Sequence, residues 1–144
     1  MTVKQFFFSA RGTGSTLGDL GLLILRLSGG LALAFAHGLG KLPPGEGFVS
    51  GVEKMGFPAP SFFAWAASFS EFAGALLVAI GLATRPAAAL VACTMATAFF
   101  LRHGPDAFEK KEKAFTYLVI FVAIMLMGAG RFSIDAIIGG KGKK

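Results

Sequence analysis

The sequence predicts an all-α integral membrane protein, a four-helix bundle with antiparallel neighbouring helices and both termini on the same side. The first reason is composition: 54% of the 144 residues are hydrophobic and 15% are charged, whereas an average soluble domain has about 25% charged residues. The second reason is that four apolar stretches approach the length of about 20 residues that a membrane-spanning helix needs. These stretches are residues 17–39, 61–83, 86–101 and 114–129. Residues 1–144 are therefore expected to form one transmembrane domain and not a water-soluble globule.

The connections between the apolar stretches indicate how the helices follow one another. Only Thr84-Arg85-Pro86 separates the second stretch from the third, so these two helices are expected to be antiparallel neighbours. The longer loop before the second stretch opens with Pro43-Pro44-Gly45, which cannot continue a helix. Within this loop, residues 48–55 place apolar side chains at helical spacing. We expect either a short helix in the membrane interface or an ordered loop with apolar anchors.

The net charge of +6 is expected to act at the membrane surface. The basic residues lie at the ends of the apolar stretches and not on a stripe with interleaved aromatics, so the expected partner is the lipid bilayer and not nucleic acid. Lys and Arg are nearly balanced between the two sides of the predicted bundle. The basic tail Lys141, Lys143 and Lys144 favours termini in the cytoplasm.

Several kinds of chemistry lack the residues they require. The single Cys93 excludes a disulfide framework and a zinc site made only of cysteines. The chain has neither the phosphate-binding G-x-x-x-x-G-K-[ST] motif nor the haem-attachment C-x-x-C-H motif, and no local spacing of His and acidic residues indicates a metal site. Whether the protein is an enzyme stays open. If it is one, a bound cofactor or another subunit supplies the difficult chemistry.

Two charged residues fall inside apolar stretches, where an unpaired ion costs about 2.5–3.5 kcal/mol at the bilayer centre. These residues are Arg26 in the first stretch and Glu71 in the second. Such side chains normally face the bundle interior and find partners. Because antiparallel neighbours allow a long guanidinium to reach the depth of Glu71, we expect an Arg26–Glu71 ion pair.

Further polar residues are expected to gather on the loop side of the bundle. His37 and Lys41 end the first apolar stretch, His103 follows the third, and Tyr117 begins the fourth, so these side chains are expected to converge above Glu71. With Arg26 they would line a polar pocket, whose two imidazoles and carboxylate suit the headgroup of a quinone. Two alternatives remain open: a structural ion pair with interfacial histidines, or a transport pathway.

On the terminus side, Arg85, Arg131 and Asp135 are expected to form a structural cluster. Arg131 and Asp135 are four residues apart, the spacing of an ion pair along a helix. Small residues also recur every fourth position in the first apolar stretch, at Gly30 and Ala34 and then at Gly38, which permits close approach of another helix.

The order of these residues resembles the DoxX family. The resemblance rests on Arg26, the segment His37-Gly38-x-x-Lys41, Glu71 with Gly74, the segment Gly81-Leu82-x-Thr84-Arg85, His103, and the segment Gly128-x-Gly130-Arg131-x-Ser133-x-Asp135. It covers about residues 18–138. Many family members place Gly-Tyr-Glu ahead of the fourth helix, where this chain has residues 112–117, Glu-Lys-Ala-Phe-Thr-Tyr. The roles of Glu112 and Tyr117 therefore do not follow from the resemblance.

The resemblance implies a four-helix protein of the bacterial inner membrane. The family's namesake is similar to a subunit of a quinone-linked thiosulfate oxidoreductase, and other relatives are membrane partners in oxidative-stress complexes. The leading hypothesis is therefore a subunit that supports quinone-linked electron transfer, with quinone as cofactor and another membrane or periplasmic protein, or further copies of the chain, as partner. The alternatives are a non-catalytic scaffold that docks its partner through residues 48–55, and a small-solute transporter.

Overall fold

The computed structural model describes residues 12–139, in which every regular element is a helix. The α-helices are α2 (Thr16–Leu33), α3 (Glu46–Lys54), α4 (Pro60–Phe69), α5 (Ala75–Ile80), α6 (Thr84–Thr97), α7 (Phe108–Met127) and α8 (Ile134–Ile138). Three π-helical turns, η1 (Ala34–Gly38), η3 (Ser70–Gly74) and η4 (Ala98–Arg102), and the 3₁₀ turn η2 (Leu39–Lys41) extend or join them. The all-α prediction is thus confirmed for the described residues.

Three continuous helical segments are long and apolar enough to cross a membrane: Thr16–Lys41, Pro60–Ile80 and Thr84–Arg102. They correspond to the first three predicted stretches. The fourth predicted stretch lies in α7, which is excluded from this set by the charged residues 109–113 in its first two turns. The described residues therefore support a membrane protein with three candidate spans. The helix α7 packs against two of them but does not itself meet the criteria for a span.

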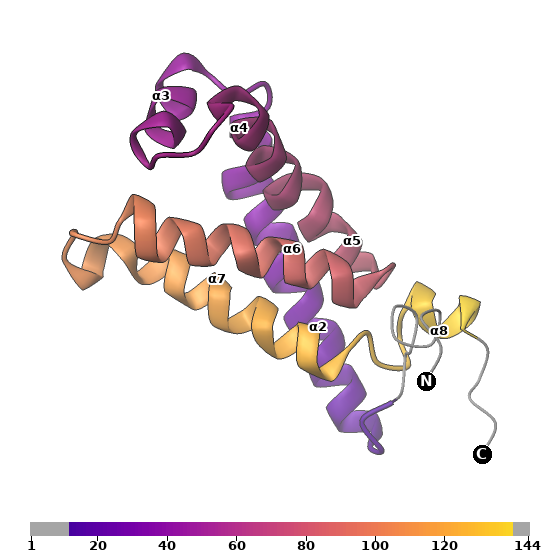
Figure 1. The fold of residues 1–144 in the computed structure, drawn as a ribbon. Coiled ribbons are helices and arrows are strands. Elements are labelled where there is room, and N and C mark those ends of the chain that lie inside the picture. The colour runs from indigo at the N-terminus through magenta and orange to yellow at the C-terminus, as the bar shows by residue number, and fades with distance from the viewer. Residues whose placement is uncertain (1–11, 140–144) are drawn as a thin grey trace.

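The helices form two pairs that are close together at one end and diverge toward the other (Figure 1). The first pair consists of α2 with η1, packed against α5 and η3. The second pair consists of α6 and α7, which lie side by side along their length. The pairs meet where α6 contacts η3 and α5, and where α2 contacts α7. The loop-side ends of the helices therefore enclose space between the two pairs.

Small residues set the close approach within the first pair. A Cβ atom added at Gly30 would lie 2.6 Å from the carbonyl oxygen of Ala75, and one at Gly38 would lie 2.6 Å from the carbonyl carbon of Glu71. Both separations are too short for any side chain. The spacing of small residues thus fixes the register of α2 and η1 against η3 and α5.

The long loop between the first two spans contains α3, which packs on α4. Of the two sequence-based alternatives for residues 48–55, the helix is the one observed. Gly51 and Val52 are buried, and Phe48 lies beneath the ammonium group of Lys41, 5.2 Å from Nζ to the ring centroid. Because this apolar side of α3 faces the rest of the chain, the structure does not present it as an open docking surface.

The turn between the second and third spans depends on Gly81, which ends α5 with a φ of +74°. A Cβ atom there would overlap the guanidinium of Arg26 and the side chain of Ser133. Ala83 follows with a φ of +47° and precedes the first turn of α6. This left-handed turn draws α5, α6 and the C-terminal segment together on the terminus side.

Candidate functional site

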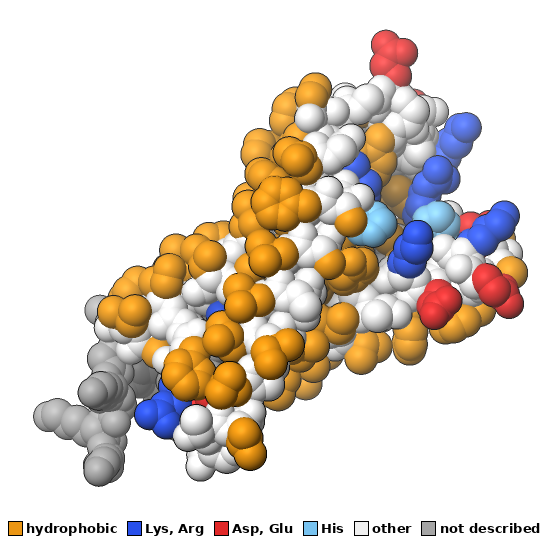
Figure 2. Space-filling view, turned by 180° about the vertical axis from the view of Figure 1, so that it is seen from behind, with side chains coloured by type: hydrophobic (Ala, Val, Ile, Leu, Met, Phe, Trp, Pro, Cys, Tyr) orange, Lys and Arg blue, Asp and Glu red, His pale blue; other side chains and the backbone are white. Residues whose placement is uncertain are grey.

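A pocket of about 160 Å³ lies between the two helix pairs on the side where they diverge. Figure 2 shows lysine and histidine side chains gathered in this recess, while apolar side chains cover the outer faces of the helices. The pocket is lined by Leu33, His37, Lys41, Glu71, Met95, Ala98, His103, Lys110, Lys113, Ala114 and Tyr117. Five of the six residues expected from the sequence are among them. Arg26 is not.

The π-helical turns bring several of these side chains to the pocket. His37 lies in η1, Glu71 lies in η3, and η4 begins at Ala98 and ends just before His103. π-Helical turns account for well under 1% of residues and occur frequently at functional sites. An extra residue in a turn rotates everything that follows around the helix axis by about 100°. The three turns therefore determine which side chains after them face the pocket, and no signal in the sequence indicated them.

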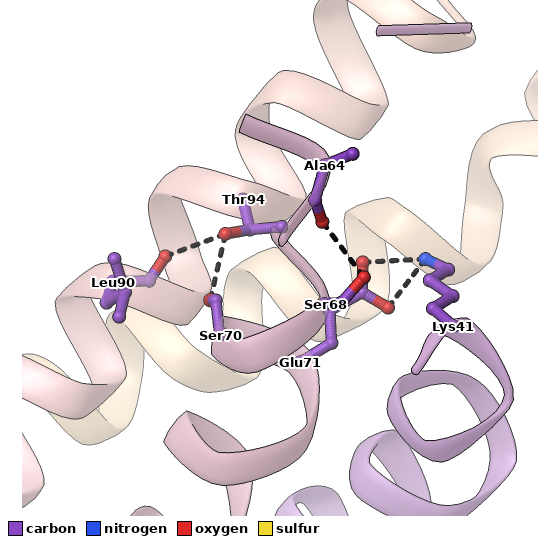
Figure 3. Close-up of polar contacts among 7 residues, drawn as sticks. All are labelled: Lys41, Ala64, Ser68, Ser70, Glu71, Leu90 and Thr94. Carbon is purple, nitrogen blue, oxygen red and sulfur yellow. Dashed lines mark hydrogen bonds and ion pairs between the residues drawn. The ribbon is translucent and has the colours of Figure 1, made fainter. Parts of the chain in front are cut away.

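Glu71 forms the central contact of the pocket with Lys41 (Figure 3). The Lys41 Nζ donates to both carboxylate oxygens, at 2.7 Å each, and Glu71 is only 3% exposed. Lys41 is 34% exposed, so its ammonium group lies between the buried carboxylate and the pocket mouth. An ammonium group has three N–H donors. Two of them serve Glu71, which leaves one for a ligand.

The predicted Arg26–Glu71 pair is wrong, and the helix register explains why. The backbone of Glu71 packs against Gly38 in η1. Arg26 lies twelve residues before Gly38 on the same continuous helical segment, which is about 18 Å away along the helix axis at 1.5 Å per residue. The expected pairing located Glu71 only by its position within its own apolar stretch. In the structure, the close contacts at Gly30 and Gly38 set the register of the two helices so that Glu71 lies level with Lys41.

Arg26 instead binds backbone carbonyls on the terminus side. Its side chain is fully buried, and its two terminal nitrogens donate to the carbonyl oxygens of Val78 (3.3 Å), Ala79 (3.4 Å) and Phe132 (2.5 Å). The first two are carbonyls of the last turn of α5, where the Val78 oxygen also accepts from the backbone nitrogen of Gly81 at 3.1 Å. Arg26 thus caps α5 and ties it to the segment that precedes α8.

The residues expected to form the terminus-side cluster each contact a different helix. Asp135 accepts hydrogen bonds from the backbone nitrogens of Ala83 (2.8 Å) and Thr84 (2.9 Å), and so caps the first turn of α6. Arg131 lies 4.0 Å from the carboxylate of Asp19, not in the expected pair with Asp135. The third member, Arg85, donates to the carbonyl of Leu126 at 3.4 Å. The carboxylate of Asp135 accepts from backbone nitrogens. The four-residue spacing of Arg131 and Asp135 had instead predicted an ion pair between the two side chains.

Two further contacts place proton-exchanging groups at the pocket. The rings of His37 and Tyr117 meet edge to face, with centroids 5.8 Å apart. His103 Nδ1 lies 2.8 Å from the carboxylate of Asp106 in the loop before α7. Within residues 12–139, no group of three His, Cys, Asp or Glu side chains is arranged to hold a metal ion. The pocket therefore offers imidazole, phenol, amine and carboxylate groups beside an apolar floor.

The hydrogen bond from His103 lowers the pKa of Asp106 below its usual value of 3.8. Because the pKa is depressed in the folded state, the contact stabilises the fold above pH 3.8, and this stabilisation is lost as the pH falls through the lower folded-state value. We expect Asp106→Asn to lower the melting temperature at pH 7, with the difference from the wild type vanishing under acidic conditions. Melting curves across the acid range check this, and a pH-independent difference would contradict it.

The comparisons with known proteins agree with the family resemblance found in the sequence. The model of the DoxX family matches residues 21–104. A protein of Bacillus subtilis (strain 168) named "Putative oxidoreductase CatD" is 33% identical over 128 residues, which cover 88% of this chain and 92% of that protein. No solved structure matches the chain significantly.

Proposed function

This chain belongs to the DoxX family, and from that premise we propose that it is a four-helix, multi-pass subunit that supports quinone-linked electron transfer in a bacterial inner membrane. In this proposal α7 is the fourth span and both termini are cytoplasmic. The electron donor is another membrane or periplasmic subunit. The relative named as an oxidoreductase supports a redox-associated role.

The observation that carries the proposal is the composition of the pocket. Its volume of about 160 Å³ is close to that of an engineered apolar cavity of roughly 150 Å³ that binds benzene, so the quinone ring of a ligand fits inside, and a second fused ring would extend toward the mouth. Leu33, Met95 and Ala114 offer an apolar surface, while Lys41 and His37 supply polar groups at the edge. A quinone headgroup combines the same two features, a ring and carbonyl oxygens that accept hydrogen bonds.

A bound quinone would take up two electrons and two protons to become a quinol. The residues of this chain would bind and orient it and supply the protons. Lys41, held by Glu71, directs its remaining N–H toward a ligand carbonyl. His37, beside Tyr117, is suited to exchange protons because one imidazole nitrogen donates a hydrogen bond while the other accepts one. His103, hydrogen-bonded to Asp106, is placed between the pocket and the loop, where protons can be replenished from water.

The test is quinone binding by the wild type and by Glu71→Gln, both purified in mild detergent. We expect the variant to bind menadione about tenfold more weakly, because a neutral amide no longer holds the Lys41 ammonium in place; tenfold corresponds to about 1.4 kcal/mol. Mass spectrometry of lipids that copurify should likewise find endogenous quinone in the wild type and less in the variant.

The matched control is Glu53→Gln, which makes the same change on the exposed side of α3. It should retain the wild-type affinity. Equal menadione affinity in wild type and a folded Glu71→Gln variant would contradict the assignment of this pocket as the quinone site.

A further inference from the structure

The mouth of the pocket carries positive charge that the described residues do not neutralise. Lys110 and Lys113 lie one turn apart on α7 and both line the pocket. Within residues 12–139, neither ammonium group makes a hydrogen bond or an ion pair. Asp106 is near enough to Lys110 for its carboxylate to feel that charge, but it is hydrogen-bonded to His103.

The acid inside the pocket does not balance these two lysines. Glu71 is the single carboxylate among the lining residues, and both of its oxygens accept from Lys41. With neutral histidines, the lining residues therefore carry two positive charges in excess. Figure 2 shows the basic side chains facing the recess.

The pocket is also lined by apolar side chains. Leu33 comes from α2, Met95 and Ala98 from α6 and η4, and Ala114 from the second turn of α7. A ligand that satisfies the whole pocket therefore has an apolar body of about ring size and a negatively charged group at one end. A neutral ring would leave the two ammonium groups without a partner.

We propose that the pocket prefers a ligand with an anionic oxygen group, a carboxylate or a phosphate, on an apolar body, and that Lys110 and Lys113 hold the anion. This inference concerns the same pocket as the proposed function but goes beyond it, because a quinone is neutral and the ligand proposed here carries a negative charge. Two sources supply this chemistry: a water-soluble aromatic acid, or the phosphate of an anionic phospholipid.

The experiment compares benzoate with benzamide, two probes of nearly the same size that differ in charge. The protein is embedded in nanodiscs of phosphatidylcholine, which adds no net charge. We expect the wild type to bind benzoate about tenfold more tightly than benzamide, since the carboxylate forms ion pairs with two exposed ammonium groups and the amide does not. The preference should weaken as ionic strength rises.

The variant Lys110→Gln/Lys113→Gln should bind the two probes equally. Lys111→Gln is the matched control, because Lys111 lies between them on α7 but its ammonium donates to the carbonyl of Gly104 and does not line the pocket. The control removes one charge from the same helix and should retain the preference for benzoate.

Replacing part of the phosphatidylcholine by phosphatidylglycerol distinguishes the two sources. Displacement of benzoate from the wild type, with retention of phosphatidylglycerol that the double variant lacks, identifies the phospholipid phosphate. Benzoate binding that is unaffected by the lipid identifies a water-soluble acid. Equal binding of benzoate and benzamide by the wild type overturns the inference.

The result of the benzoate experiment can be interpreted independently of the result of the quinone test. Menadione binding without any preference for benzoate would overturn this inference and leave the proposed function standing. A preference for benzoate without menadione binding would support the inference and remove the quinone assignment.

Discussion

Replacing Arg26 by Met is expected to lower the free energy of unfolding by about 3–5 kcal/mol, because each buried carbonyl that is left without a donor costs about 1–3 kcal/mol. The Arg26 side chain is fully buried and donates to three backbone carbonyls, two at the end of α5 and one at Phe132. Methionine fills much of the same volume but removes the Arg26 donor from all three oxygens, and of these the Val78 oxygen keeps its bond from the backbone nitrogen of Gly81. Chemical unfolding in mixed micelles, followed by helical circular dichroism, measures the change.

Two further variants separate charge from geometry. Arg26→Lys should recover less than half of the loss, because an ammonium group cannot replace the planar fork that spans α5 and the C-terminal segment. Arg131→Met is the control, since Arg131 is 61% exposed and should change stability by less than about 1 kcal/mol. If Arg26→Met were as mild as Arg131→Met, Arg26 would not be a structural tie between these segments.

The ion pair between Lys41 and Glu71 should respond asymmetrically to removal of each partner. Lys41→Met leaves the carboxylate, 3% exposed, without its partner, and should cost about 3 kcal/mol. That value is at the low end of the range for buried pairs because the 34% exposure of Lys41 admits solvent screening. Glu71→Gln should cost about 1 kcal/mol, because the remaining ammonium can turn toward the mouth of the pocket.

The double variant Lys41→Met/Glu71→Gln completes the cycle. It should be more stable than Lys41→Met alone, because no buried carboxylate is left without its partner at this pair of positions, and the coupling energy should be about 2 kcal/mol. Unfolding in mixed micelles at neutral pH provides all three values. Strictly additive costs would show that the two groups act independently, against the 2.7 Å contacts between them.

Hydropathy predicted the helical segments that are long and apolar enough to cross a membrane. The first three apolar stretches agree with Thr16–Lys41, Pro60–Ile80 and Thr84–Arg102 to within a few residues, because an apolar run of this length has few alternatives to a helix in a membrane. The small residues around Gly38 also indicated close packing. They did not indicate which turn of the neighbouring helix each would meet.

The sequence predicted most of the residues that line the candidate site, but it did not predict which groups are in contact with one another. His37, Lys41, Glu71, His103 and Tyr117 line one pocket as expected, because each lies near the same end of its helix. The partner of Arg26 was not predictable, since a backbone carbonyl has no signature in the sequence. Lys110 and Lys113 were also missed as pocket residues, because a run of charges before an apolar stretch is also the ordinary flank of a membrane helix.

The hydrogen bond from Arg26 to the carbonyl of Phe132 joins residues 106 positions apart. During synthesis at about 5–20 residues per second, roughly 5–20 s pass between the appearance of the donor and that of its acceptor. Asp135, which caps α6, is synthesised later still. Throughout this interval the helices already made contain a guanidinium whose contact with Phe132 does not yet exist, although its acceptors at Val78 and Ala79 are made about halfway through. The terminus side can therefore close only after the other helices have been made, and a chain truncated before Phe132 would keep its candidate spans but lose the hydrogen bond from Arg26 to Phe132 and the caps from Asp135.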